Sequence, residues 1–155
     1  MNEVAWSVRR RRVDDDDLAQ LVEQINRATM EDGEPVTLGS LSELLADDDH
    51  LFLTVHAGAQ LAGTLHAIHH LHPSSRRELY VDEVDTDEAF RRQGVAAAMM
   101  REACDIAARA GASAVWLATG ERNTAARALY DSLGAPEPER VVMYTFMPGS
   151  VGSQE

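Results

Sequence analysis

The sequence predicts a mixed α/β domain in which helices flank a sheet, and three observations point to this fold class. The chain has 155 residues, which is the size of one ordinary domain. Hydrophobic residues make up 45% of it, enough to build a core. Short strand-like and helix-like segments alternate along the chain. We expect one domain over residues 1–147, followed by a flexible tail over residues 148–155.

Each element follows from a local pattern. Apolar residues that recur every three to four positions predict helices, and short apolar runs bounded by Gly or Pro predict strands. Asp14 suits the start of the first helix, Gly58 marks a hairpin connection, and Gly111 and Gly134 each follow a helix. The predicted helices cover residues 14–28, 40–46, 95–110 and 123–133. The predicted strands cover residues 6–12, 51–56, 60–70, 78–84, 114–118 and 140–146.

Composition and charge exclude several classes of protein. The formal net charge is −12, and nucleic-acid binding requires a basic face instead. No apolar stretch approaches the roughly 20 residues that cross a bilayer, and no signal peptide is recognisable. A single cysteine excludes an internal disulfide framework. We therefore expect a cytoplasmic protein with no nucleic-acid or membrane partner, and its acidity favours a cationic small molecule.

The chemically most informative segment is Arg91-Arg92-Gln93-Gly94-Val95-Ala96, which lies between a predicted strand and a long predicted helix. The first turn of a helix presents unpaired N–H groups and a partial positive charge, so it binds phosphates. Gly94 and Ala96 are small where the backbone would approach a pyrophosphate, and Arg91 and Arg92 add positive charge. An ordinary helix start beside surface arginines explains the same residues, so this segment alone leaves both interpretations open.

The segment resembles the Arg/Gln-x-x-Gly-x-Gly/Ala signature of the GNAT superfamily of N-acetyltransferases. A second segment resembles the family's Asn-x-x-Ala-x-x-Leu-Tyr-x-x-Leu-Gly pattern, through Asn123, Ala126, Leu129, Tyr130, Leu133 and Gly134. The resemblance is strong over residues 78–134 and consistent in pattern over residues 5–147. Two departures stand out: Asp87-Glu88 replaces a frequent proline, and Ala135 stands where an aromatic residue is common.

The resemblance implies an enzyme that moves an acetyl group directly from acetyl-coenzyme A to a primary amine. It implies that residues 93–96 hold the pyrophosphate, that residues 84–86 pair with the pantetheine arm, and that Tyr130 is the general acid near the thioester sulfur. The strand at 78–84 and the strand at 114–118 would part to admit this arm. The implied cofactor-binding residues are Val84, Asp85, Thr86, Arg91, Arg92, Gln93, Gly94, Val95, Ala96 and Asn123.

The reaction needs a base, because a protonated amine has no lone pair and an amine like that of lysine has a pKa of about 10.4. A carboxylate, directly or through water, can accept the proton. Glu83, at the end of a predicted strand, is our candidate, and Asp85 shares its face and is the alternate. Asp82 should point to the other face unless a bulge intervenes. A solvated strand end is the competing explanation for all these carboxylates.

Acidic residues near the expected acceptor site indicate its charge. Glu31, Asp32 and Glu34 lie between the first two predicted helices, where the family resemblance places the acceptor. With Glu83 and Asp85 they would form a negative funnel for an aminoglycoside, a polyamine or a basic peptide terminus. The C-terminal half is similar to aminoglycoside 3-N-acetyltransferases, so an aminoglycoside acceptor, and with it antibiotic resistance, is our leading specific expectation.

Three alternatives remain open. The protein could be a non-catalytic sensor of an acyl-coenzyme A, an acetyltransferase of a protein or peptide amine, or an α/β domain without any cofactor. The sequence is also compatible with a homodimer.

Several other residues suggest chemistry that we do not expect. His66, His70 and His72 would share one strand face, but no cysteine or acidic residue completes a recognisable ligand spacing near them, so we expect no metal site. One of these histidines is a candidate for lining the acceptor pocket. The arginines of residues 9–12 are interpreted as a solvated edge paired with aspartates 14–17, and Cys104 as a buried, inert thiol.

Overall fold

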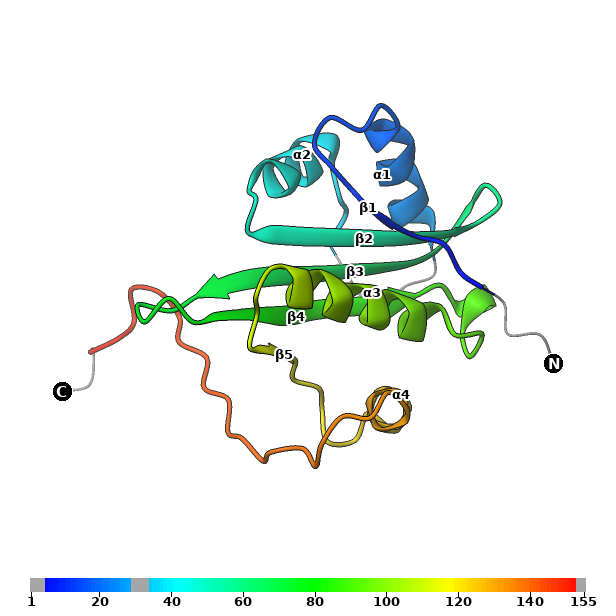
Figure 1. Ribbon diagram of the computed structural model, residues 1–155. Coiled ribbons are helices and arrows are strands. Elements are labelled where there is room, and N and C mark those ends of the chain that lie inside the picture. The colour runs from blue at the N-terminus through cyan, green and yellow to red at the C-terminus, as the bar shows by residue number, and fades with distance from the viewer. Residues whose placement is uncertain (1–4, 29–33, 153–155) are drawn as a thin grey trace.

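A five-stranded sheet in the order β1-β2-β3-β4-β5 lies at the centre of the structure (Figure 1). The computed structural model describes residues 5–28 and 34–152. The strands are β1 (Val8–Arg10), β2 (His50–Ala57), β3 (Gln60–Leu71), β4 (Arg77–Thr86) and β5 (Ala114–Trp116). The helices are α1 (Leu18–Arg27), α2 (Leu38–Ala46), the short 3-10 helix η1 (Glu88–Phe90), α3 (Val95–Arg109) and α4 (Thr124–Ser132). Strands β1 to β4 run antiparallel to their neighbours, whereas β5 runs parallel to β4, which confirms the predicted mixed α/β class.

Different helices cover the two faces of the sheet (Figure 1). Helix α3 packs its buried Val95 and Met99 against one face, which carries alternate strand residues such as Leu65. Helices α1 and α2 cover the opposite face of β2 and β3, where their leucines pack with Leu61 and Phe52. The two hydrophobic clusters therefore lie on opposite sides of one sheet. A register shift leaves Ala62 as an extra residue of β3, so Leu61 and Leu65 face opposite sides.

Gly63 on β3 sets how closely α3 approaches the sheet. A Cβ atom at this position would lie 2.7 Å from Val95 Cγ1, 2.9 Å from Met99 Cε and 2.9 Å from the carbonyl oxygen of Asp85. All these distances are shorter than a carbon atom tolerates, so only glycine fits. The start of α3, which carries the expected phosphate-binding turn, is thereby held against β3 and the end of β4.

The predicted closing strand over residues 140–146 is wrong. In the described part of the chain this segment joins no sheet. Its large apolar side chains, from Val141 to Met147, are 69% to 86% exposed. The β-branched and aromatic residues here favour a strand, but a strand forms only where a neighbour supplies hydrogen-bond partners, and that is not visible in local composition.

The N-terminal charged residues differ in part from the prediction. Arg11 is only 3% exposed and forms ion pairs with Asp15 and Asp17, so the expected pairing is confirmed but Arg11 is not solvated. A buried guanidinium requires such partners. Helix α1 begins after Asp17 and not after Asp14, and the Asp17 side chain makes no capping hydrogen bond because it binds the arginines instead.

Helix α3 is amphipathic, and Cys104 lies outside its buried stripe. The buried residues of α3 include Met99, Ala103 and Ala107, which recur at helical spacing. Cys104 is exposed, so the prediction of a buried thiol is wrong. Neither α3 nor any other described helix has the length and apolar character that crossing a bilayer requires.

Candidate active site

Strands β4 and β5 part halfway along β4. They pair at Glu78 with Ala114, Leu79 with Val115 and Tyr80 with Trp116. Strand β4 then continues to Thr86, past the end of β5 at Trp116. The two strands that we predicted to part are thus paired along the first part of β4, and the last part of β4 extends beyond β5 (Figure 1).

A β-bulge in β4 lies where the strands part. His66 of β3 pairs with Glu83, but the next residue, Ala67, pairs with Val81, which leaves Asp82 as the extra residue of β4. A bulge bends its strand and turns side chains that would otherwise alternate. Asp82 accordingly reaches the face of Glu83, where its Oδ2 lies 3.4 Å from Nδ1 of His66. This is the exception that the sequence left open for Asp82.

The bulge gathers three carboxylates on one face of β4. Glu83 lies opposite His66 and Asp85 lies opposite Thr64, so both share the face of β3 that carries His66. Asp82 joins them through its contact with His66. Asp82 and Glu83 are exposed, and Asp85 is half-buried. The end of β4 therefore presents three carboxylates close together, beside the imidazole of His66.

His66 links these carboxylates to a second histidine that the sequence reasoning missed. Nδ1 of His50 on β2 lies 2.8 Å from Nε2 of His66, and the two rings stack with centroids 5.0 Å apart. If Asp82 accepts the proton on Nδ1 of His66, then Nε2 of His66 accepts a hydrogen bond from Nδ1 of His50. His50 stood just outside the predicted strand, and its diagonal position across from His66 depends on a register that local patterns do not contain.

The environment keeps His66 neutral near pH 7. Burial lowers the pKa of His66, and the neighbouring His50 lowers it further, while Asp82 and Glu83 oppose these effects without reversing them. A neutral imidazole can accept a proton, which a protonated one cannot. His66 therefore has the protonation state of a base.

The turn before α3 has the geometry of an anion-binding site. Gly94 is the N-terminal cap of α3 with φ +85°, and Arg92 also has a positive φ, of 60°. The first helical hydrogen bond runs from Ala98 N–H to the Gly94 carbonyl at 3.0 Å, so the N–H groups of residues 95–97 precede it at the positive end of the helix.

Side chains fix this turn in place. The indole N–H of Trp6 donates to the carbonyl oxygen of Gln93 at 2.7 Å, and the amide of Gln93 donates to the carbonyl of Ala89 at 3.0 Å. Arg91 Nε donates to the carbonyl of Thr86 at 3.3 Å, which ties the turn to the end of β4. Trp6, which the sequence analysis did not identify, is thus a structural support of the turn.

Helix α4 carries the remaining predicted residues. The side chain of Asn123 accepts a hydrogen bond from Ala126 N–H at 3.2 Å and so caps α4, while its amide group keeps its donor hydrogens. Tyr130 is half-buried and packs against the hydrophobic cluster under α3. Burial raises the pKa of Tyr130, so its hydroxyl keeps its proton at neutral pH.

The predicted acidic loop is described only at one residue. Glu31 and Asp32 lie outside the described residues, and Glu34 is exposed just before α2. The contribution of this loop to an acceptor site stays a prediction, whereas the carboxylates of β4 are brought together by the bulge.

The parted strands and the anion-binding turn agree with the family that the sequence resembles. The family model described as “Acetyltransferase (GNAT) family” matches residues 16–135, which is most of the chain. The protein therefore belongs to the GNAT family and is an acetyltransferase of that family. A comparison with curated proteins found no match that would identify it further.

Solved structures share this fold at low sequence identity. An aminoglycoside acetyltransferase from an uncultured soil metagenomic sample, solved with sisomicin, has a TM-score of 0.79 and 16% identity, covering 92% of this chain and 95% of that one. A second aminoglycoside acetyltransferase from such a sample has a TM-score of 0.75 and 22% identity, covering 94% and 99%. A ribosomal-protein-alanine N-acetyltransferase from Brucella melitensis biovar Abortus 2308 has a TM-score of 0.68 and 17% identity, covering 92% and 100%. These likenesses confirm the predicted fold.

Proposed function

We propose that the protein transfers the acetyl group of acetyl-coenzyme A to a primary amine of a small cationic acceptor, an aminoglycoside or a polyamine-like molecule. The proposal rests on one observation: the extension of β4 past β5 leads, through the short helix η1, to the turn at the start of α3. Arg91 joins the two through its 3.3 Å hydrogen bond to Thr86. A ligand with a pyrophosphate at one end and an amide-bearing arm at the other matches this pair of subsites.

The chain's own groups account for binding of such a donor. The N–H groups of residues 93–96 and the positive end of α3 would hold the pyrophosphate, with Arg92 beside them. Main-chain groups of residues 84–86 would pair with the amides of the arm, as an added strand pairs with a sheet edge. Asn123, whose amide hydrogens remain available, would donate to the same arm.

The acidic face of β4 supports a cationic acceptor. Asp82, Glu83 and Asp85 lie on one face at the place where the thioester would end. A net charge of −12 attracts cations toward this face from a distance. Two of the structures with this fold are aminoglycoside acetyltransferases, which motivates sisomicin as the first acceptor to test. An aminoglycoside acceptor would give the protein a role in antibiotic resistance.

The proposed reaction needs one group that accepts a proton from the amine and one that donates a proton to the thiolate. Acetyl-coenzyme A, when bound, supplies a thioester whose C–S bond breaks as the amine nitrogen forms a C–N bond. Glu83, supported by the neutral His66 opposite it, would take the proton that the amine loses, with Asp85 as the alternate base. Tyr130, protonated at neutral pH, would supply a proton to the departing thiolate. The acetyl group passes directly to the amine, so no covalent enzyme intermediate is required.

Calorimetric titration with acetyl-coenzyme A tests the donor site. Gly94→Glu places bulk and negative charge in the turn at a left-handed residue, so we expect binding to be lost. Gly58→Glu is the matched control, because Gly58 also has a positive φ, of 60°, and lies in the turn between β2 and β3. Unchanged affinity in Gly94→Glu would refute the assignment of this turn.

Turnover separates the alternatives that share this fold. An acyl-coenzyme A sensor would bind the donor but release no free thiol with any amine, and an α/β domain without a cofactor would not bind it at all. An acetyltransferase of a protein amine would release thiol with peptides that have a free N-terminus in preference to sisomicin.

We also propose a cytoplasmic location, where acetyl-coenzyme A is supplied and a single free cysteine stays reduced.

A further inference from the structure

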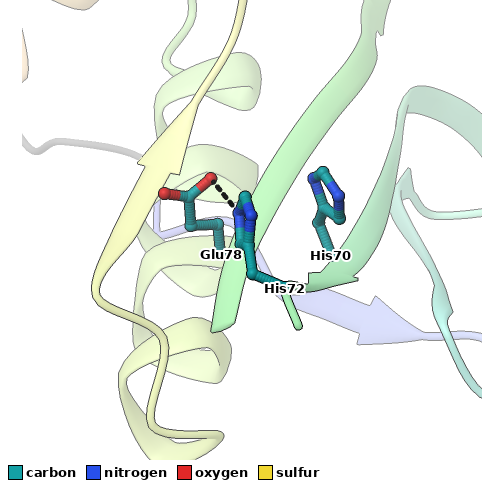
Figure 2. Close-up of side chains that lie close together, drawn as sticks. All are labelled: His70, His72 and Glu78. Atoms are coloured by element: carbon teal, nitrogen blue, oxygen red, sulfur yellow. Dashed lines mark hydrogen bonds and ion pairs between the residues drawn. The ribbon is translucent and has the colours of Figure 1, made fainter. Parts of the chain in front are cut away.

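Two histidines share one face at the end of β3. His70 lies in β3 and His72 immediately follows the last residue of this strand, Leu71, and the two rings lie on the same side. Their ring centroids are 4.4 Å apart at an interplanar angle of 24°. The rings are stacked, so at least one of them must turn before their in-plane nitrogen lone pairs point to the same ion. The pair lies at the tip of the β3–β4 hairpin (Figure 2).

The hairpin supplies the acidic residue that the sequence spacing lacks. Glu78 of β4 lies directly opposite His70 in the strand register. Its Oε2 accepts a hydrogen bond from Nε2 of His72 at 3.1 Å, the dashed line in Figure 2. One ligand atom from each of the three residues lies within 4.8 Å of the others. Glu78 is six residues from His72 in sequence, across a turn, which is why a search for ligands along the chain does not find it.

We propose that His70, His72 and Glu78 form a binding site for a divalent transition-metal ion, with Zn²⁺ as the best match. Two imidazole nitrogens and one carboxylate oxygen are ligands that Zn²⁺ accepts, with solvent in the remaining position. Ligand atoms around tetrahedral zinc are about 3.3 Å apart, so atoms that now lie within 4.8 Å of one another must close in by up to about 1.5 Å. His70 is exposed and can turn to do so. This proposal departs from the sequence-based expectation of no metal site.

The neighbours of the cluster are compatible with a bound cation. Arg76 forms an ion pair with the other carboxylate oxygen of Glu78, Oε1, at 3.4 Å, and the Trp116 side chain also donates a hydrogen bond to Glu78. Its terminal nitrogen lies 3.4 Å and 3.3 Å from the two ring nitrogens of His72. An atom almost equally far from both nitrogens at this distance lies over the ring face, so it does not occupy the in-plane lone pair that a metal needs. Its positive charge nevertheless opposes a second cation, and removing it should strengthen binding.

The site is remote from the proposed donor site and does not depend on it. Thr86 is eight positions after Glu78 on β4, which is roughly 26 Å of strand at 3.3 Å per residue. A metal here would join β3 to β4 beside the turn that connects them and stabilise the hairpin. Binding to the folded chain alone raises the unfolding temperature by mass action.

Titration of the tag-free, chelator-treated chain with Zn²⁺ alone tests the proposal. We expect one ion per chain, a higher Tm with zinc, and an affinity that falls at least about tenfold in His70→Ala and in Glu78→Gln. Arg76→Gln should bind Zn²⁺ more tightly than the unmodified chain, because it removes a cation that lies beside the cluster.

Two control variants keep the result interpretable. His69→Ala removes the neighbouring histidine on the opposite strand face and should bind zinc as the unmodified chain does. His66→Ala removes the stacked pair with His50, the other place where two imidazoles meet. The proposal is overturned if zinc binds no more tightly to the unmodified chain than to the His70→Ala, His72→Ala double variant, or if only His66→Ala weakens binding.

Discussion

Tyr130 joins two properties in one side chain, because its ring is packed against the core while its hydroxyl keeps its proton at neutral pH. Tyr130→Phe removes only the hydroxyl and leaves the ring packing intact. General acid catalysis contributes about 10²–10⁴-fold, so we expect turnover to fall within that range while acetyl-coenzyme A affinity changes little. Single-turnover kinetics together with calorimetry measures both quantities. An unchanged rate, with chemistry limiting, would exclude Tyr130 as the acid.

Glu83 and His66 make a prediction about pH. The lowered pKa of His66, caused first by burial and then by His50, keeps the imidazole neutral below the ordinary histidine value of about 6.5. The unmodified protein should therefore keep its rate as the pH falls toward and below 6.5. In Glu83→Gln, and to a smaller extent in His66→Gln, the acid limb of the pH–rate profile should move to higher pH, because the acceptor must lose its proton without help. Identical profiles in all three proteins would exclude both residues from proton transfer.

Local sequence patterns identify individual candidate residues, but they do not identify which side chains contact one another in the fold. Gly94 and Tyr130 are tied to motifs on single helices, so local pattern was sufficient to select them. Asp82 and His50 belong to the site only through a bulge and a strand register, and Glu78 meets His72 only across a hairpin. These contacts are non-local, and no spacing along the chain predicts them.

The elements around α3 depend on one close contact with the sheet. Gly63→Ala would place a methyl group 2.7 Å from Val95 Cγ1 and 2.9 Å from the Asp85 carbonyl, so either α3 or β4 must shift. Overpacking of this kind costs about 1–3 kcal/mol, and acetyl-coenzyme A affinity should fall as well because the turn moves with α3. Urea unfolding gives the free energy of unfolding.

Gly120→Ala is the control for that substitution. No atom lies within 4 Å of a Cβ atom at Gly120, and its φ is not in the left-handed range. The free energy of unfolding should change by less than about 0.5 kcal/mol. Equal stability of the Gly63→Ala and Gly120→Ala variants would mean that the contact of α3 with β3 adapts without cost.

The sequence predicts an element well where its hydrophobic periodicity is strong, and predicts it poorly where the element depends on pairing with another strand. The long helix predicted at residues 95–110 is observed as Val95–Arg109, because its apolar stripe and the following Gly111 are local signals. The strand predicted at residues 140–146 has comparable β-propensity but joins no strand of the described sheet. Strand formation is a property of two segments, so one segment's composition could not predict it.

The association of whole molecules depends on exposed apolar surface, and the segment from Val141 to Met147 is a large surface of this kind. Surfaces of this kind mark interaction sites, so we expect concentration-dependent self-association, consistent with the homodimer that the sequence allows. Deletion from Arg140 onward should leave the free energy of unfolding nearly unchanged and yield monomers. Sedimentation at several concentrations measures this, and a full-length chain that stays monomeric throughout would contradict it.

Acetyl transfer to a cationic amine can be measured in an acceptor screen at saturating acetyl-coenzyme A. Free thiol released by the enzyme would be compared for sisomicin, spermidine, a peptide with a free N-terminus, a neutral amine and a free acidic amino acid. The acidic face of β4 and the net charge of −12 predict that sisomicin and spermidine rank first. Their apparent affinity should fall with added salt, which screens charges beyond about 8 Å at physiological ionic strength. Higher turnover with the neutral or acidic amines, or no thiol release despite donor binding, would contradict the account.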